Sequence, residues 1–226
     1  ENELQTMLRG WSEAVETELA EYEEPGRAAA VALRFAEAFP ADYRAKFGAK
    51  QAAMDIARLR RLRAHADDGE RALRRRDARL FRTDRDGPSA LHLKLYQEEG
   101  SLPLSDAVPV LENFGFHVQS EIPTVLDDGQ LGTIHDFVLQ LAPGIDVEDL
   151  VARADAIEEA VARVINGASE NDTFNRLVSE AQLSEREANW LRAFYRYLRQ
   201  TGMGFTIYTV VDALSGASDV TRALIA

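Results

Sequence analysis

The fold is decided by a short alternating stretch in the middle of the chain, Leu91-His92-Leu93-Lys94-Leu95-Tyr96. Leucines occupy every second position, and other residue types stand between them. Successive side chains of a strand point to opposite faces, so this pattern predicts a strand with one apolar face. A turn-forming run, Asp84-Arg85-Asp86-Gly87-Pro88, separates it from another strand candidate at residues 78–83. Together these stretches predict a β-hairpin.

Two more strands and two helices are predicted after the hairpin. Alternating apolar residues predict a third strand over residues 116–123, and a more continuous apolar run predicts a fourth over 131–141. Between the hairpin and the third strand, Ser105 is expected to cap a helix. After the fourth strand, Asp146 is expected to cap one long helix that ends at Gly167.

The predicted order of elements is therefore β-β-α-β-β-α. Compact sheets with two helices on one face are usually built as βαββαβ, with the last strand antiparallel beside the first. Moving that strand to the front makes it a hairpin partner, so the expected sheet order is 78–83, 89–97, 131–141, 116–123. The predicted fold class is α+β: an ACT-like or ferredoxin-like four-stranded antiparallel sheet, with a displaced first strand and two helices on one face.

Helical segments are predicted on both sides of this sheet. Apolar residues recur there at spacings of three and four, which is typical of amphipathic helices. Ser184 and Glu187 have the spacing of a capping box at the start of one such helix. The expected domains are a helical segment at residues 1–66, the α+β domain at 67–168 and a second helical segment at 169–226.

The composition excludes several classes of protein. The 226 residues include no cysteine, which excludes disulfides, cysteine-ligated metal sites and thiol catalysis and is typical of a reducing cytoplasm. No apolar run approaches the roughly 20 residues needed to span a bilayer, so no membrane partner is expected. The chain starts at Glu1 without a methionine and stops inside a helix-like pattern. We therefore expect a piece of a longer polypeptide.

The net charge of −12 conceals two opposite blocks. Residues 44–94 carry a net charge of +8, and residues 95–175 carry −14. Only Phe81 and Tyr96 lie near the arginines of the basic block, and the strand at 131–141 offers only Phe137 where an RNA-binding sheet carries stacking aromatics. We therefore expect no nucleic-acid partner, and we expect the basic block to contact an acidic surface of the same assembly.

No motif predicts a catalytic residue, a cofactor site or a metal site. The chain has no phosphate-binding loop, and Gly202-Met203-Gly204 lacks the third glycine and the preceding strand of a dinucleotide fingerprint. The four histidines share no metal-ligand spacing. His135 and Asp136 are adjacent, but neighbours on a strand point to opposite faces and cannot chelate one ion together.

One small-molecule site is predicted, at the start of the helix near residue 105. Leu104, Ser105 and Asp106 would present free backbone N–H groups that a ligand carboxylate could bind, and Asp106 could hold an α-ammonium group. The competing interpretation is that Ser105 and Asp106 only cap the helix and complement its dipole.

Six strings, in this order, resemble one enzyme family. They are Phe39-Pro40-Ala41-Asp42-Tyr43-Arg44, Leu93-Lys94-Leu95-Tyr96, Leu102-Pro103-Leu104-Ser105-Asp106-Ala107, Leu111-Glu112-Asn113-Phe114-Gly115, Ile134-His135-Asp136-Phe137 and Asn171-Asp172-Thr173-Phe174-Asn175-Arg176-Leu177. The chain resembles, over most of residues 10–215, the N-terminal region of the large bacterial NAD-dependent glutamate dehydrogenases. In that family, ACT-type domains and helical motifs precede the catalytic domain.

The resemblance implies a non-catalytic regulatory or oligomerisation fragment of an oxidoreductase. The parent enzyme would convert L-glutamate, NAD and water to 2-oxoglutarate, ammonia and NADH, with NAD and the catalytic residues elsewhere in the parent chain. The implied partners are the rest of that chain, further copies in a cytoplasmic homo-oligomer and an amino-acid effector. The alternatives are a stand-alone amino-acid-binding ACT sensor domain and an RNA-binding ferredoxin-like module.

Overall fold

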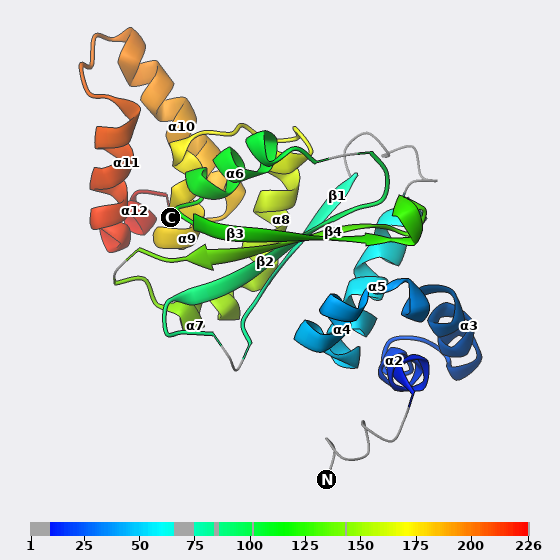
Figure 1. Cartoon of the computed structure of the whole chain (residues 1–226). Coiled ribbons are helices and arrows are strands. Elements are labelled where there is room, and N and C mark those ends of the chain that lie inside the picture. Colours follow the sequence, from blue (N-terminus) through cyan, green and yellow to red (C-terminus); the bar gives the residue numbers. More distant parts are fainter. Residues whose placement is uncertain (1–9, 66–74, 84–85, 101, 143, 226) are drawn as a thin grey trace. The chain divides into compact units, whose positions relative to one another are not determined.

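The structure is a computed structural model that describes residues 10–65, 75–83, 86–100, 102–142 and 144–225 (Figure 1). The predicted domain boundary at residues 66–67 lies outside these residues. The division into three domains therefore stays a prediction.

Four strands form one sheet. They are β1 (Arg76–Phe81), β2 (Ala90–Gln97), β3 (His117–Leu126) and β4 (Gly132–Gln140). Their order in the sheet is β1-β2-β4-β3, which confirms the predicted order and the α+β class with its displaced first strand. The strand β3 continues to Leu126 instead of ending at residue 123. Pro123 does not stop it, because β3 is an edge strand, where proline is tolerated.

Helices precede, connect and follow these strands. Before the sheet come α2 (Trp11–Leu19), α3 (Pro25–Phe35), α4 (Ala41–Phe47) and α5 (Ala49–His65). Connected to the strands are α6 (Leu104–Asn113), α7 (Val147–Ala152) and α8 (Ala154–Ile165). The last group is α9 (Arg176–Glu180), α10 (Glu185–Gln200), α11 (Ile207–Gly216) and α12 (Ser218–Ile225), in which the predicted capping box of Ser184 and Glu187 is present at the start of α10.

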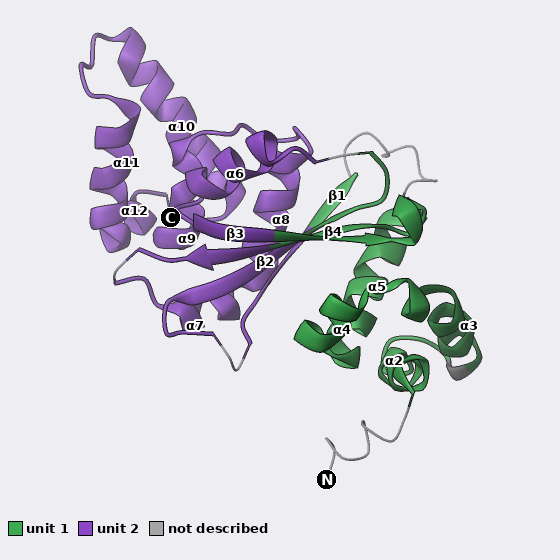
Figure 2. Cartoon of the chain, viewed as in Figure 1, with its two compact units in different colours: residues 1–77, 95–101, 122–136 green, residues 78–94, 102–121, 137–226 purple. Residues whose placement is uncertain are grey.

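The chain separates into two compact units (Figure 2). Unit 1 comprises residues 1–77, 95–101 and 122–136, and unit 2 comprises residues 78–94, 102–121 and 137–226. All four strands contribute residues to both units, so the sheet belongs to both.

The core of unit 1 is built around a buried carboxylate. Asp55 of α5 is fully buried and accepts hydrogen bonds from the hydroxyls of Tyr43 at 2.5 Å and Tyr96 at 2.8 Å. A buried charge is costly unless it is hydrogen-bonded, so these two donors fix α4 and β2 against α5. Lys46 of α4 binds the buried Asp136 of β4 at 2.7 Å. Apolar residues surround these groups, among them Val15, Leu19, Phe35, Phe39, Ile56, Leu59, Leu131 and Ile134.

In unit 2, α8 closes the edge of the sheet at β1. The backbone N–H of Leu80 donates to Oε1 of Glu158 at 2.8 Å, and Glu158 is only 6% exposed. Edge strands leave such N–H groups unpaired, so this acid satisfies one of them. The helix α6 packs on α8, and Leu91 and Leu93 of β2 are fully buried in the same unit.

The prediction of one long helix after Asp146 is wrong, because the structure has two helices there. The side chain of Asp146 caps α7 as predicted, but α7 ends at residue 152 and Arg153 has φ −108° and ψ 19°. The Arg153 guanidinium donates to Asp149 and to the backbone carbonyls of Val178 and Ser179. These bonds link Arg153 to a distant segment. In the sequence, apolar residues recur at helical spacing from Val147 to Val164, so the pattern predicted no break at residue 153.

The close approach of backbone and side chains at Gly132 gives a stability prediction. Gly132 has φ +108°, and a Cβ atom there would lie 2.7 Å from Cδ2 of Leu59 and 2.8 Å from the carbonyl oxygen of Gln97. We expect Gly132→Ala to lower the free energy of unfolding by about 3 kcal/mol, because a clash is added to a strained φ. Urea denaturation of the purified chain measures this loss.

The control is Gly129→Ala, in the turn just before β4. Gly129 has φ +89°, but nothing lies within 4 Å of the added Cβ. The strain in φ alone should lower the free energy of unfolding by about 1 kcal/mol. Equal losses for the two variants would show that the close approach at Gly132 does not matter.

Candidate functional site

The ligand site predicted from the sequence lies at the start of α6. Pro103, not Ser105, is the N-cap residue, so the predicted capping role of Ser105 is wrong. The reason is that the carbonyl of Pro103 already accepts the first helical hydrogen bond, from Ala107 at 3.2 Å. Leu104, Ser105 and Asp106 are all exposed, and the Ser105 hydroxyl donates to Asp106 at 3.3 Å. Ligand binding at these three residues stays a prediction.

The described residues do not fit a metal ion or a dinucleotide. No group of three or more histidine, aspartate and glutamate side chains in this part of the chain could hold a metal ion. Gly202 and Gly204 follow α10 and precede α11, whereas the dinucleotide fingerprint joins a strand to a helix. In the same described ranges, no helix is long and apolar enough to cross a membrane.

The basic residues of α5 bind acids of unit 1. The ion pairs are Arg58–Asp77 at 3.2 Å, Arg61–Asp77 at 2.6 Å, Arg63–Glu98 at 3.1 Å and Arg60–Glu23. A guanidinium that already holds a carboxylate is less available to a phosphate, because the new partner must first displace the old one. Arg71, Arg74 and Arg85 of the same basic block lie outside the described residues.

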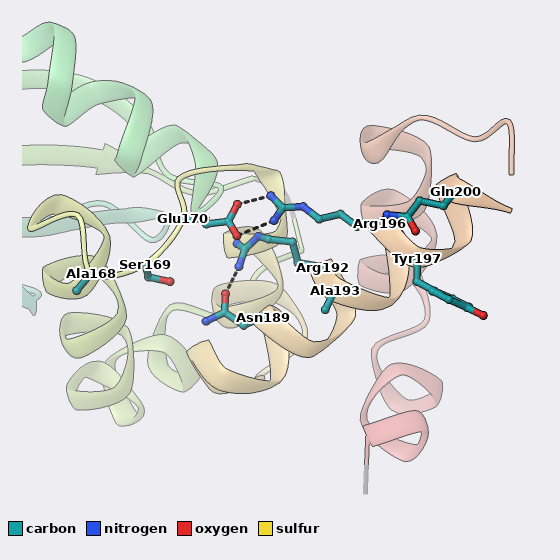
Figure 3. A pocket seen from close by; sticks show the side chains of 9 residues that line it. All are labelled: Ala168, Ser169, Glu170, Asn189, Arg192, Ala193, Arg196, Tyr197 and Gln200. Carbon is teal, nitrogen blue, oxygen red and sulfur yellow. Dashed lines mark hydrogen bonds and ion pairs between the residues drawn. The ribbon is translucent and has the colours of Figure 1, made fainter. Parts of the chain in front are cut away.

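A surface pocket of about 510 Å³ lies in unit 2, where the turn after α8 meets α10 (Figure 3). Both segments contribute side chains to it. The lining residues are Ala168, Ser169, Glu170, Asn189, Arg192, Ala193, Arg196, Tyr197 and Gln200.

One side of the pocket is fixed by a buried arginine. Arg192 is only 2% exposed, and its guanidinium donates to both carboxylate oxygens of Asp172, at 2.8 and 2.9 Å. It also donates to the side-chain oxygens of Asn175 and Asn189. Because Asp172 in turn accepts from the backbone N–H of Phe174, this side of the pocket is held by a connected set of hydrogen bonds.

The other side carries an exposed ion pair. Arg196 and Glu170 face each other through two parallel hydrogen bonds, one of them 2.8 Å from Nη1 to Oε1 (Figure 3). Their side chains are 55% and 52% exposed, respectively. The hydrogen bond from Arg196 is the main reason that the pKa of Glu170 lies below its ordinary value of 4.5. The same bond raises the pKa of Arg196.

A row of large apolar side chains lies exposed on another face of α10. Trp190 is 44% exposed, Phe194 is 64%, Tyr197 is 65% and Leu198 is 45%. Their spacing places them on one side of the helix. We call these four residues the aromatic face of α10. Two more aromatic residues, Phe205 and Tyr208, are exposed in the segment that follows.

Comparison with known families accounts for most of the chain. Residues 18–62 match the family described as glutamate dehydrogenase, helical motif 2, and residues 75–151 match glutamate dehydrogenase, ACT3 domain. Residues 169–226 match glutamate dehydrogenase, helical motif 3. The chain belongs to the glutamate dehydrogenase family. This confirms the resemblance that the six strings indicated, and it places the pocket and α10 in helical motif 3.

Three relatives carry the name NAD-specific glutamate dehydrogenase. The protein of Pseudomonas aeruginosa is 33% identical over 227 residues, which cover 100% of this chain and 14% of the relative. That of Halomonas elongata is 34% identical over 85% of this chain and 11% of the relative. That of Mycobacterium tuberculosis is 28% identical over 86% of this chain and 12% of the relative. The chain thus spans about one seventh or less of the length of these relatives.

The ion pair in helical motif 3 gives a prediction about the titration of Glu170. We expect Arg196→Gln to raise the pKa of Glu170 back toward 4.5, because the main cause of its lowering is removed. A lowered carboxyl pKa stabilises the folded chain above the ordinary pKa, and this contribution is lost as the pH falls through the folded value. Since both side chains are half exposed, the effect on stability is small. Carboxyl chemical shifts recorded by NMR from pH 2 to 7 measure the change.

The matched control for this titration is Arg199→Gln. Arg199 lies on the same helix, does not line the pocket and donates to the backbone carbonyl of Met203 instead. This variant removes the same charge but should leave the pKa of Glu170 where it is. A pKa of Glu170 that responds equally to both variants would contradict a specific Glu170–Arg196 pair.

Proposed function

We propose that this chain is a non-catalytic part of a cytoplasmic NAD-specific glutamate dehydrogenase, in which it helps to assemble and regulate the polypeptide. The complete enzyme would oxidise L-glutamate with NAD and water to 2-oxoglutarate, ammonia and NADH, in a homo-oligomer. In this proposal NAD and the reacting groups lie in other parts of the polypeptide. The chain acts through contacts with those parts, and an amino-acid effector bound at Leu104, Ser105 and Asp106 would be one input.

The observation that carries the assembly role is the aromatic face of α10. Exposed apolar rows of this size on a helix are typical of surfaces that another protein surface covers. Tryptophan, tyrosine and phenylalanine are also enriched at the centres of such interfaces. If this side of the helix stayed in water, polar residues would be expected at the positions of Phe194 and Leu198.

The occupant that we propose is another part of the same polypeptide. The relatives named above contain much more sequence than this chain, which covers 11–14% of their lengths. In the Pseudomonas aeruginosa relative, which aligns over all of this chain, a large additional part is covalently tethered to the segment that corresponds to α10. Tethering raises the effective concentration of that part, so an intramolecular contact forms before any contact with a separate protein.

Substitution of Phe194 tests this proposal in two contexts. In the complete polypeptide, Phe194→Ser should lower the midpoint of the calorimetric transition in which this segment unfolds by a few degrees, because a buried phenylalanine contributes about 2 kcal/mol. In the 226-residue chain alone, the same variant should leave the midpoint unchanged, because Phe194 is 64% exposed there. Differential scanning calorimetry of both pairs of proteins makes the comparison.

The control is Leu33→Ser on α3, where Leu33 is 84% exposed but not part of an aromatic row. This variant should leave the midpoint of thermal unfolding unchanged, both in the complete polypeptide and in the 226-residue chain. An unchanged midpoint for Phe194→Ser in the complete polypeptide would contradict intramolecular docking. A Phe194→Ser variant that dissociates a dimer of the 226-residue chain, measured by analytical ultracentrifugation, would instead assign the face to self-association.

A further inference from the structure

We infer that the pocket of helical motif 3 binds a small zwitterion of the α-amino-acid class, whose carboxylate is held by Arg196 and whose ammonium group is held by Glu170. This site is separate from the start of α6. The inference does not depend on docking through the aromatic face.

The two charges have the chemistry that an α-amino acid requires. The planar guanidinium of Arg196 offers two parallel N–H donors, which match a carboxylate, and the carboxylate of Glu170 matches an ammonium group. In the free chain these two groups bind each other at the pocket (Figure 3). A zwitterion can be inserted between them so that each side chain exchanges one opposite charge for another. Neither is then left without a partner.

The exchange is easy because the pair is half exposed. Ion pairs between exposed side chains contribute little to stability, so a ligand that separates Glu170 from Arg196 loses little. A glutamate of ordinary pKa is ionised at neutral pH, so Glu170 remains a carboxylate after the pair separates, as an ammonium partner requires. A pair whose arginine is buried, such as Arg192 with Asp172, would not separate in this way.

The rest of the pocket is suited to a ligand of this size. Its volume of about 510 Å³ lies in the range of roughly 300–1,000 Å³ that is usual for small-molecule sites. The small side chains of Ala168 and Ala193 leave this space open, and Gln200 adds an amide to the lining. Arg192 and Asn189 are already hydrogen-bonded to each other, so the wall need not become ordered on binding.

The charges also discriminate between classes of ligand. A 2-oxo acid or another anion would bind Arg196 but would leave Glu170 facing a second negative charge. A simple amine would bind Glu170 but would leave Arg196 facing a second positive charge. Only a ligand with both charges avoids these like-charge contacts.

Isothermal titration calorimetry of the 226-residue chain with each of the twenty protein amino acids tests the inference. At least one of them should bind with a dissociation constant below about 10 mM. Two analogues of the amino acid that binds most tightly serve for comparison: the matched carboxylic acid without the amine, and the matched amine without the carboxylate. The dissociation constant of each should be at least about tenfold higher. The absence of binding by every amino acid would overturn the inference.

Three variants locate the binding site. Arg196→Gln and Glu170→Gln should each weaken binding about tenfold or more, because each removes a charge-assisted hydrogen bond. The matched control Arg199→Gln should bind like the unaltered chain. If Asp106→Asn abolishes binding while Arg196→Gln does not, the ligand binds at the start of α6 and the inference is wrong. Circular dichroism confirms that each variant is folded.

Discussion

The rest of the structure depends on one constraint, which is that strand β2 is buried on both faces. From Leu91 to Gln97 every residue of this strand is buried. The leucines of one face need only apolar neighbours, but the alternate residues are polar and need partners. Tyr96 donates to Asp55, the ring of His92 is 3.1 Å from Asp86, and the ammonium of Lys94 lies 5.3 Å from the centre of the Phe81 ring. Helix α5, the hairpin turn and strand β1 must therefore each bring a specific group to β2.

This constraint explains why the sheet could be predicted from the sequence while one helix break could not. The alternation of apolar and other residues with a period of two can be seen within a single strand. It is clearest in β2, the strand from which the predicted sheet order starts. At the break between α7 and α8, the Arg153 side chain donates to the carbonyls of Val178 and Ser179, about 25 residues away. An apolar stripe that runs on both sides of residue 153 carries no information about such distant bonds. Similarly, Ser105 has the residue type of a helix cap, but the position of Pro103 decides where the helix begins.

The pocket could not be predicted from the sequence either, because it too depends on contacts between segments that lie apart in the chain. Its lining comes from two segments, residues 168–170 and 189–200, which the sequence pattern does not connect. The pair of Arg192 and Asp172 brings the second segment to the first, and these residues are 20 positions apart. One local signal was available, because Asn189, Arg192 and Arg196 recur at helical spacing in α10. That spacing indicates a polar face, but it does not indicate that an acid from another turn meets it.

Helix α10 unites the two proposals, because it presents three different faces. Ala188 and Leu191 lie toward the core of unit 2, the aromatic face is exposed, and Asn189 and Arg196 line the pocket. With 3.6 residues per turn these faces are separated by about 120°. Tyr197 belongs both to the aromatic face and to the pocket lining, so it stands where two of the faces meet. A partner that packs on Tyr197 would restrict the same side chain that borders a ligand in the pocket. By thermodynamic reciprocity, the ligand would then change the affinity of docking by the factor by which docking changes the affinity of the ligand. Tyr197 would then couple the two events, because it is the side chain that the aromatic face and the pocket lining share.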